Sequence, residues 1–307
     1  MMIYLNEHIH PEALETVGRH AEIVQDYSQI EEIHAIIVRT EPVTREIIEK
    51  AKNLKVIGKH GIGYDNIDVE AAKELGVSVV YTPTANFQAV AELIVTLMSS
   101  TSRNIVQNVE RIKGGKLTTN APADLVGTEM VGKTVALIGM GNVALTAAAI
   151  LRNGYQMNIT GYDPFVSNEK ATSLGIKKYD SVAELLPEAD YINVSVPLTD
   201  TTRNIISENE LRLCKRSAIL INTSRGGTVN ETDLYQALKD GTIRAAASDV
   251  FVTEPPTLDH PLIQLENFVP TPHIGASTEE SMYRMGTTVV REVLTVLAGD
   301  KAKYHVL

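Results

Sequence analysis

The sequence has few of the features that mark secreted or membrane proteins. Its 307 residues include a single cysteine, Cys214, which cannot form an internal disulfide and so excludes a disulfide-stapled framework. No apolar run reaches the roughly 20 residues that a membrane-spanning helix needs. The N-terminal segment is too short and too acidic for a signal peptide. We therefore expect a cytoplasmic protein with no membrane association.

Basic charge is also scarce. The 28 Lys and Arg residues are outnumbered by 38 Asp and Glu, which gives a formal net charge of -10. Nucleic-acid binding needs a basic face, and no cluster of Lys and Arg of that kind is present, so we expect no nucleic-acid partner. We also assign no metal site. The length exceeds one typical hydrophobic core and predicts two domains.

The first third of the chain alternates between strand-like and helical patterns. Apolar runs at residues 3–5, 35–38, 55–57 and 77–81 are separated by helical patterns such as 44–52 and 69–75. This alternation predicts a parallel sheet. The apolar spacing in residues 89–113 then predicts one long helix that can cross between domains, and the Gly, Thr and Pro residues at 114–122 predict a loop.

A second alternating series follows, and a last helical pattern at residues 278–297 can return to the first sheet. The predicted fold is therefore α/β, with two Rossmann-like lobes that each contain a parallel sheet. We expect a discontinuous, flavodoxin-like substrate domain at residues 1–101 and 285–307. Residues 102–284 are expected to form an NAD-binding domain, with the active cleft between the lobes.

The cofactor assignment depends on one turn. The strand TVALI leads into Gly139 and Gly141, and a second strand ends on Asp163, about 20 residues further on. Gly139 permits a tight turn, Gly141 lets the backbone approach a pyrophosphate, and Asp163 can accept hydrogen bonds from a ribose diol. The third glycine of the pattern is Ala144, a permitted substitute. The alternative is an ordinary strand-to-helix turn that binds nothing.

Three charged or titratable residues follow predicted strands in the second half of the chain. Arg225 stands in N-T-S-R-G-G, and its planar guanidinium can hold a carboxylate through two hydrogen bonds. Glu254 precedes two prolines, and His273 stands in T-P-H-I-G-A. A carboxylate that holds one imidazole nitrogen can aim the other at a substrate oxygen. Singly, each residue could be an ordinary surface or loop residue, but together they predict a site that binds a 2-oxo acid and supplies a proton.

Several further motifs resemble the D-isomer-specific 2-hydroxyacid dehydrogenase family. They are G-T-E-M-V-G-K-T-V-A-L-I-G-M-G, Y-D-P, V-P-L-T-D-T-T-R, I-N-T-S-R-G-G, S-D-V-F-V-T-E-P-P and T-P-H-I-G-A-S-T, with G-K-H-G-I-G-Y-D-N-I-D in the first lobe. The resemblance implies an NAD-dependent oxidoreductase that acts on a CH–OH group and forms a homodimer through its cofactor domain.

The resemblance also implies roles for individual residues. Arg225 would grip the substrate, His273 would be the acid/base, and Glu254 would hold His273. The loop at Lys59, Gly61, Ile62 and Gly63 would receive the substrate carboxylate. The cofactor contacts would be Gly139, Gly141 and Asp163 together with Thr82, Asn142, Val143, Val196, Thr223, Ser224, Asp249, Gly275 and Ala276.

The sequence leaves the choice of substrate open between those of two groups of enzymes. The loop at Lys59 resembles phosphoglycerate dehydrogenases, whereas G-Y-D-N at residues 63–66 also resembles glyoxylate and hydroxypyruvate reductases. Phosphate recognition needs converging cations or amide groups, and Lys59 supplies a single cation. An alternative of another class is an NAD(H)-sensing binding protein, similar to a corepressor, on the same scaffold.

Overall fold

A computed structural model describes residues 1–306, which form two compact units. Unit 1 comprises Met1–Ala89 together with residues 276–306, and unit 2 comprises Val90–Gly275. The chain therefore leaves unit 1 once and returns to it, as a discontinuous domain does. Both units are built on parallel sheets, which fits the predicted fold class. The domain limits expected from the sequence, at residues 101 and 284, stay a prediction.

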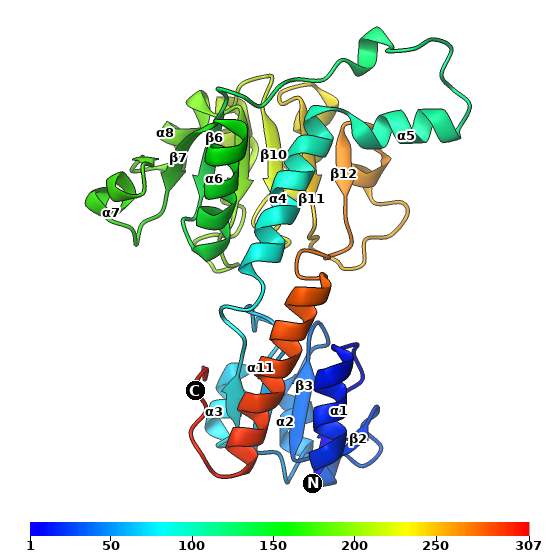
Figure 1. Ribbon diagram of the computed structural model, residues 1–307, viewed down its shortest axis with the longest axis vertical. Coiled ribbons are helices and arrows are strands. Elements are labelled where there is room, and N and C mark those ends of the chain that lie inside the picture. The colour runs from blue at the N-terminus through cyan, green and yellow to red at the C-terminus, as the bar shows by residue number, and fades with distance from the viewer. Residues whose placement is uncertain (307) are drawn as a thin grey trace. The chain divides into compact units, whose positions relative to one another are not determined.

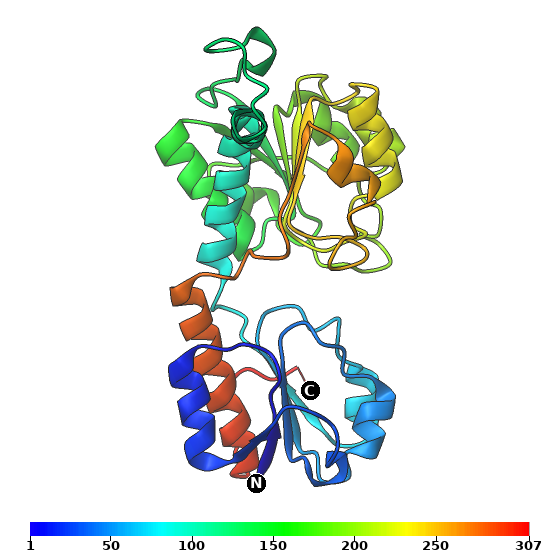
Figure 2. The same ribbon diagram turned by 90° about the vertical axis from the view of Figure 1, so that its right-hand side faces the viewer.

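The sheet of unit 1 has five parallel strands. Their order is β2 (Glu22–Val24), β1 (Met2–Tyr4), β3 (Ala35–Val38), β4 (Val56–Lys59) and β5 (Ser78–Val80). This is the flavodoxin-like order. Strand β3 is buried along its whole length because helices cover both of its faces. Figure 2 shows α1 (Pro11–His20) and α11 (Glu279–Leu297) on one face and α2 (Arg45–Lys50) and α3 (Val69–Glu74) on the other.

The sheet of unit 2 has seven parallel strands. Their order is β12 (Phe268–Pro270), β11 (Ala245–Ser248), β10 (Ile219–Asn222), β9 (Tyr191–Val194), β6 (Thr134–Ile138), β7 (Asn158–Tyr162) and β8 (Lys177–Lys178). The direction of strand succession reverses between β6 and β9. Such a reversal opens a crevice at the carboxyl ends of the strands, where doubly wound proteins bind their ligands.

Helices cover both faces of the second sheet (Figures 1 and 2). On one face, α4 (Phe87–Ser102) and α6 (Asn142–Tyr155) pack on Val135 and Leu137 in one apolar cluster. On the other face, α8 (Val182–Leu185), α9 (Glu208–Leu213) and α10 (Glu231–Lys239) pack on Ala136 and Ile138. The remaining short elements are α7 (Asn168–Ser173) and the 3₁₀ turns η1 (Ile30–Glu32), η2 (Ala123–Leu125), η3 (Leu186–Glu188) and η4 (Pro261–Gln264).

The prediction of a single long helix at residues 89–113 is wrong. The structure ends α4 at Ser102 and starts a separate helix, α5 (Ile105–Lys113), after a break at Asn104. Asn104 has a φ of 51°, in the left-handed region that interrupts a right-handed helix and that asparagine tolerates better than most residues. Residues 114–122 contain no helix or strand, as predicted.

Candidate active site

The glycine turn after β6 has the form that a pyrophosphate needs. Gly139 has a φ of 90°, and a Cβ there would lie 2.4 Å from the carbonyl oxygen of Ser195, so only glycine fits. A Cβ at Gly141 would meet no atom within 4 Å, which leaves the backbone open to a ligand. Gly141 is also the N-cap of α6, and no side chain caps this helix within the described residues. The free amide groups of a 14-residue helix therefore face this position.

Asp163 lies at the end of β7, beside this turn. Its Oδ2 accepts a hydrogen bond from the Met140 amide at 2.9 Å, and its Oδ1 accepts one from the Phe165 amide at 2.8 Å. These bonds fix the carboxylate next to the glycine turn, and each oxygen keeps a lone pair for a further donor. An open amide terminus with a fixed carboxylate beside it is the donor and acceptor set that NAD requires. The residues present therefore fit this cofactor.

Glu254 and His273 form a direct pair. Nδ1 of His273 lies 2.7 Å from Oε2 of Glu254, and about a third of each side chain is exposed. Burial raises the pKa of Glu254, but hydrogen bonds from His273 and from the Phe251 amide, with the charge of Arg225, hold it below its ordinary value. Glu254 is therefore an anion that fixes one ring nitrogen and leaves Nε2 to act on a ligand.

Arg225 stands on the loop that follows β10. The side chain of Asn222 organises this loop: its Oδ1 accepts from the Ser224 amide at 3.0 Å, and its Nδ2 donates to the Arg225 carbonyl at 3.3 Å. The Arg225 guanidinium donates to the Ser224 carbonyl at 2.7 Å and is half-buried. The sequence did not lead us to predict a role for Asn222, although Asn followed by Thr and Ser at a strand end is a turn signal.

Asp249 holds the turn that carries His273. This carboxylate is buried and accepts hydrogen bonds from the Thr271 hydroxyl and from the amides of Ile274 and Gly275, at 2.6 to 2.8 Å. Its backbone carbonyl also accepts from the His273 amide at 2.9 Å. His273 has a φ of 54°, an uncommon conformation for a residue with a Cβ. The four bonds to Asp249 keep the turn in that conformation.

The other residues expected to contact the cofactor are spread over both units. Asn142 and Val143 begin α6, and Val196 follows β9 and flanks Gly139. Thr223 and Ser224 lie on the Arg225 loop, and Gly275 closes the His273 turn. Thr82 belongs to unit 1, where it is buried and its hydroxyl donates to the Gly61 carbonyl at 3.1 Å, and Ala276 also lies in unit 1.

The loop after β4 contains the residues expected to receive a substrate carboxylate. Gly61 has a φ of 155°, and Ile62 and Gly63 continue the loop as half-buried residues. Lys59, at the end of β4, is 7% exposed, and its ammonium donates to the Arg39 carbonyl and to Oδ1 of Asn66. These bonds direct Lys59 into unit 1, where it joins two loops of the same sheet edge.

Other chemistry is limited in the described part of the chain. Burial raises the pKa of Cys214 to about 12, so its thiol is a weak nucleophile at neutral pH. Among residues 1–306, no group of three His, Cys, Asp or Glu side chains could hold a metal ion. Over the same residues, no helix has the length and apolar character to cross a bilayer.

The sequence is similar to proteins of one family. The family model described as the NAD binding domain of D-isomer specific 2-hydroxyacid dehydrogenases matches residues 95–275. D-3-phosphoglycerate dehydrogenase of Methanocaldococcus jannaschii is 45% identical over 276 residues, which are 90% of this chain and 52% of that protein. Hydroxypyruvate reductase of Thermotoga maritima is 40% identical over 289 residues, which are 93% of this chain and 92% of that protein. The chain thus spans about half the length of the phosphoglycerate dehydrogenases that it matches.

Solved structures agree with this similarity. The TT0316 protein from Thermus thermophilus matches with a TM-score of 0.92 and 29% identity, over 100% of both chains. An NADPH-dependent glyoxylate/hydroxypyruvate reductase from Sinorhizobium meliloti, solved with NADP and malonate, matches with a TM-score of 0.88 and 25% identity. That alignment covers 99% of this chain and 96% of the other.

Proposed function

The chain belongs to the D-isomer specific 2-hydroxyacid dehydrogenase family, and we propose that it is an NAD-dependent oxidoreductase that interconverts a small 2-oxo acid and its D-2-hydroxy acid. The observation that carries this proposal is the 2.7 Å pair of His273 and Glu254 in the domain that has the dinucleotide turn. An oriented imidazole beside a nicotinamide site supplies what carbonyl reduction requires.

We assign the roles of the three side chains as follows. NADH, when bound, supplies the hydride that reduces the keto carbon. Glu254 holds Nδ1 of His273, so Nε2 carries the proton that the keto oxygen receives. Arg225, on a loop fixed by Asn222, binds the carboxylate of the substrate and polarises its carbonyl. In the oxidative direction His273 takes the proton back.

Roles are also proposed for the residues around the dinucleotide turn and for the loop after β4. Gly139, Gly141 and the first residues of α6 receive the pyrophosphate, and Asp163 accepts from the adenosine ribose. In the loop after β4, Ile62 and Gly63 offer backbone amides to a carboxylate, whereas the Gly61 amide donates to the Lys59 carbonyl at 3.0 Å and Gly61 shapes the turn. The hydrogen bonds of Asp249 to the His273 turn indicate that it positions this turn in addition to any contact with the cofactor.

Hydroxypyruvate and glyoxylate are the proposed substrates. Lys59, the single cation that this loop could offer to a phosphate, already donates to two acceptors inside unit 1, so a phosphate dianion would have to compete with them. The hydroxypyruvate reductase relative is also matched over nearly its whole length. 3-Phosphoglycerate is the second candidate, because the phosphoglycerate dehydrogenase of Methanocaldococcus jannaschii has the higher identity of the two.

Steady-state assays test this proposal. Purified protein is given NADH or NADPH with a panel of 2-oxo acids, and NAD⁺ with 3-phosphoglycerate. We expect turnover of hydroxypyruvate or glyoxylate. Turnover of 3-phosphoglycerate alone would select the second candidate. Tight NADH binding without turnover of any acid would instead favour the NAD(H)-sensing, corepressor-like alternative.

We also propose a cytoplasmic homodimer that forms through the cofactor domain. Ile105, Val109 and Ile112 are 50%, 41% and 63% exposed, and their spacing places them on one face of α5. A continuous apolar stripe of this kind is typical of a protein interface. Light scattering tests the proposal: Ile112→Glu should convert a dimer into a monomer, and a monomeric wild-type protein would exclude the dimer.

A further inference from the structure

The segment that carries Glu254 is held by two carboxylates. The Phe251 amide donates to Oε1 of Glu254 at 2.9 Å, and the next amide, that of Val252, donates to Oε1 of Glu231 at 2.7 Å. Glu254 belongs to the segment itself, whereas Glu231 is the first residue of α10. The Val252 bond is therefore a tether between this segment and a separate helix.

The same peptide packs against the loop of Arg225. A Cβ at Gly226 would lie 2.0 Å from the Phe251 carbonyl oxygen and 2.5 Å from the Val252 nitrogen. The two backbones are thus in direct contact, and only glycine permits the approach. Because Gly226 follows Arg225, any displacement of the peptide between Phe251 and Val252 also presses on the loop of Arg225.

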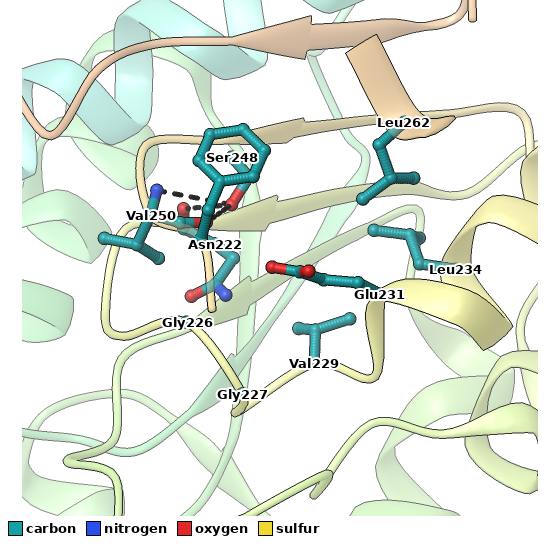
Figure 3. A pocket seen from close by; sticks show the side chains of 10 residues that line it. Asn222, Gly226, Gly227, Val229, Glu231, Leu234, Ser248, Val250 and Leu262 are labelled. Carbon is teal, nitrogen blue, oxygen red and sulfur yellow. Dashed lines mark hydrogen bonds between the residues drawn. The ribbon is translucent and has the colours of Figure 1, made fainter. Parts of the chain in front are cut away.

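Glu231 has a second partner on a third segment. Its Oε2 lies 3.2 Å from Nε2 of His260, and the ring of His260 packs edge to face on Phe251 at 5.3 Å between centroids. Figure 3 shows Glu231 reaching from the start of α10 into a hollow lined by Gly226 and Leu262. The side chain of Glu231 is only 23% exposed and that of His260 only 15%, so water competes weakly for these bonds.

We propose that Glu231, supported by His260, is a positioning residue that sets the places of Glu254 and Arg225 together. This inference rests on the proposed function. The path runs from Glu231 to the Val252 amide, through the adjacent Phe251 amide to Glu254, and on to His273. Loss of the tether frees the peptide that Gly226 touches, so the proton donor and the carboxylate-binding arginine lose alignment. Misplacement of about 1 Å can lower a rate about a hundredfold.

Substitutions at Glu231 test the proposal by steady-state kinetics and hydrogen exchange. Glu231→Ala should lower kcat for 2-oxo acid reduction at least tenfold and leave the Kd for NADH within twofold. The solvent deuterium isotope effect on kcat should rise, because proton transfer from a misaligned His273 limits turnover. Glu231→Gln keeps an acceptor for the Val252 amide and should recover at least half of the wild-type kcat.

Asp233 provides a matched control. It is an acidic residue of the same first turn of α10, but its carboxylate accepts from the Glu208 amide at 3.0 Å and not from the segment that carries Glu254. Asp233→Ala should keep the wild-type kcat and isotope effect. His260→Phe keeps a ring beside Phe251 and should lower kcat less than Glu231→Ala does. This variant serves as the test if Glu231→Ala does not fold.

Three results would overturn the tether. They are a wild-type kcat in Glu231→Ala, an equal loss in Asp233→Ala, or, where Glu231→Ala does not fold, a wild-type kcat in His260→Phe. Hydrogen exchange of the peptide at residues 249–256 separates this failure from failure of the proposed function. If the wild-type protein reduces no 2-oxo acid, the proposed function fails, yet faster exchange in Glu231→Ala than in Asp233→Ala still supports the tether, and equal exchange rejects it.

Discussion

Stability should depend on pH through His60, a residue to which the proposed reaction gives no role. Its side chain is 1% exposed, and neither ring nitrogen has a hydrogen-bond partner within the described residues. Burial, with the nearby positive charge of Arg39, lowers the pKa of His60 from 6.5 to about 4. The folded protein therefore keeps this imidazole neutral at pH values where the unfolded chain protonates it.

The sign and size of the effect follow from proton linkage. Between pH 6.5 and 4 the unfolded state binds the extra proton, so stability is fully present above pH 6.5 and is lost as the pH falls toward 4. At about 1.4 kcal/mol for each pKa unit, the whole difference corresponds to about 3 kcal/mol. Between pH 7.5 and pH 5, His60 alone should account for about 2 kcal/mol of lost stability.

Urea unfolding of the wild-type protein and of His60→Leu at pH 7.5 and pH 5 measures this contribution. Carboxylates with lowered pKa values also lose stabilising interactions in acid, but they do so in both proteins and cancel in the difference. We expect the variant to lose about 2 kcal/mol less than the wild type, with hydrogen exchange of β3 and β4 peptides reporting on unit 1 separately. Identical losses in the two proteins would refute the reasoning.

Three further predictions concern the reaction. His273→Gln should lower kcat by about 100- to 10,000-fold with little change in the Kd for NADH, and near wild-type turnover would reject His273 as the proton donor. Asp163 should repel a 2′-phosphate, so kcat/KM should favour NADH over NADPH and Asp163→Ala should narrow the ratio; equal values in the wild type would contradict this role. Lys59→Ala should impair all substrates alike, because Lys59 joins two loops of unit 1. A rise in KM of at least tenfold for 3-phosphoglycerate alone would identify it as a phosphate ligand.

The fold could be predicted because its signals are local. Buried parallel strands are short apolar runs, and the sequence marks the dinucleotide turn by placing Gly139 and Gly141 directly after such a run. The break between α4 and α5 could not be predicted in this way. The apolar spacing continues through Asn104, and only its left-handed backbone, a single-residue choice, ends the helix.

For the candidate site, the sequence indicates where the three charged side chains lie but not which residues hold them in place. Arg225, Glu254 and His273 follow strands, and the parallel arrangement brings the ends of β10, β11 and β12 to one edge of the sheet. The residues that hold them were not visible, because their partners are backbone amides. Nothing in the sequence tells which amide the carboxylate of Glu231 or Asp249 accepts from. The inward direction of Lys59 likewise depends on Asn66 and on a backbone carbonyl of another loop.

Unit 1 is built from two stretches of chain that are separated by the whole of unit 2, and this order matters for synthesis on the ribosome. Val289 and Val293 of α11 cover the sheet of unit 1, and they pack so closely that a Cβ at Gly58 would lie 2.6 Å from Val293. The strands they cover are all complete by residue 80, yet α11 is translated only after the whole of unit 2. For that interval the part of this sheet face that α11 covers lies exposed beside α1, which makes it a candidate for chaperone binding or aggregation. A slowed ribosome between residues 90 and 275 should therefore lower the yield of folded protein more than the same delay before residue 80.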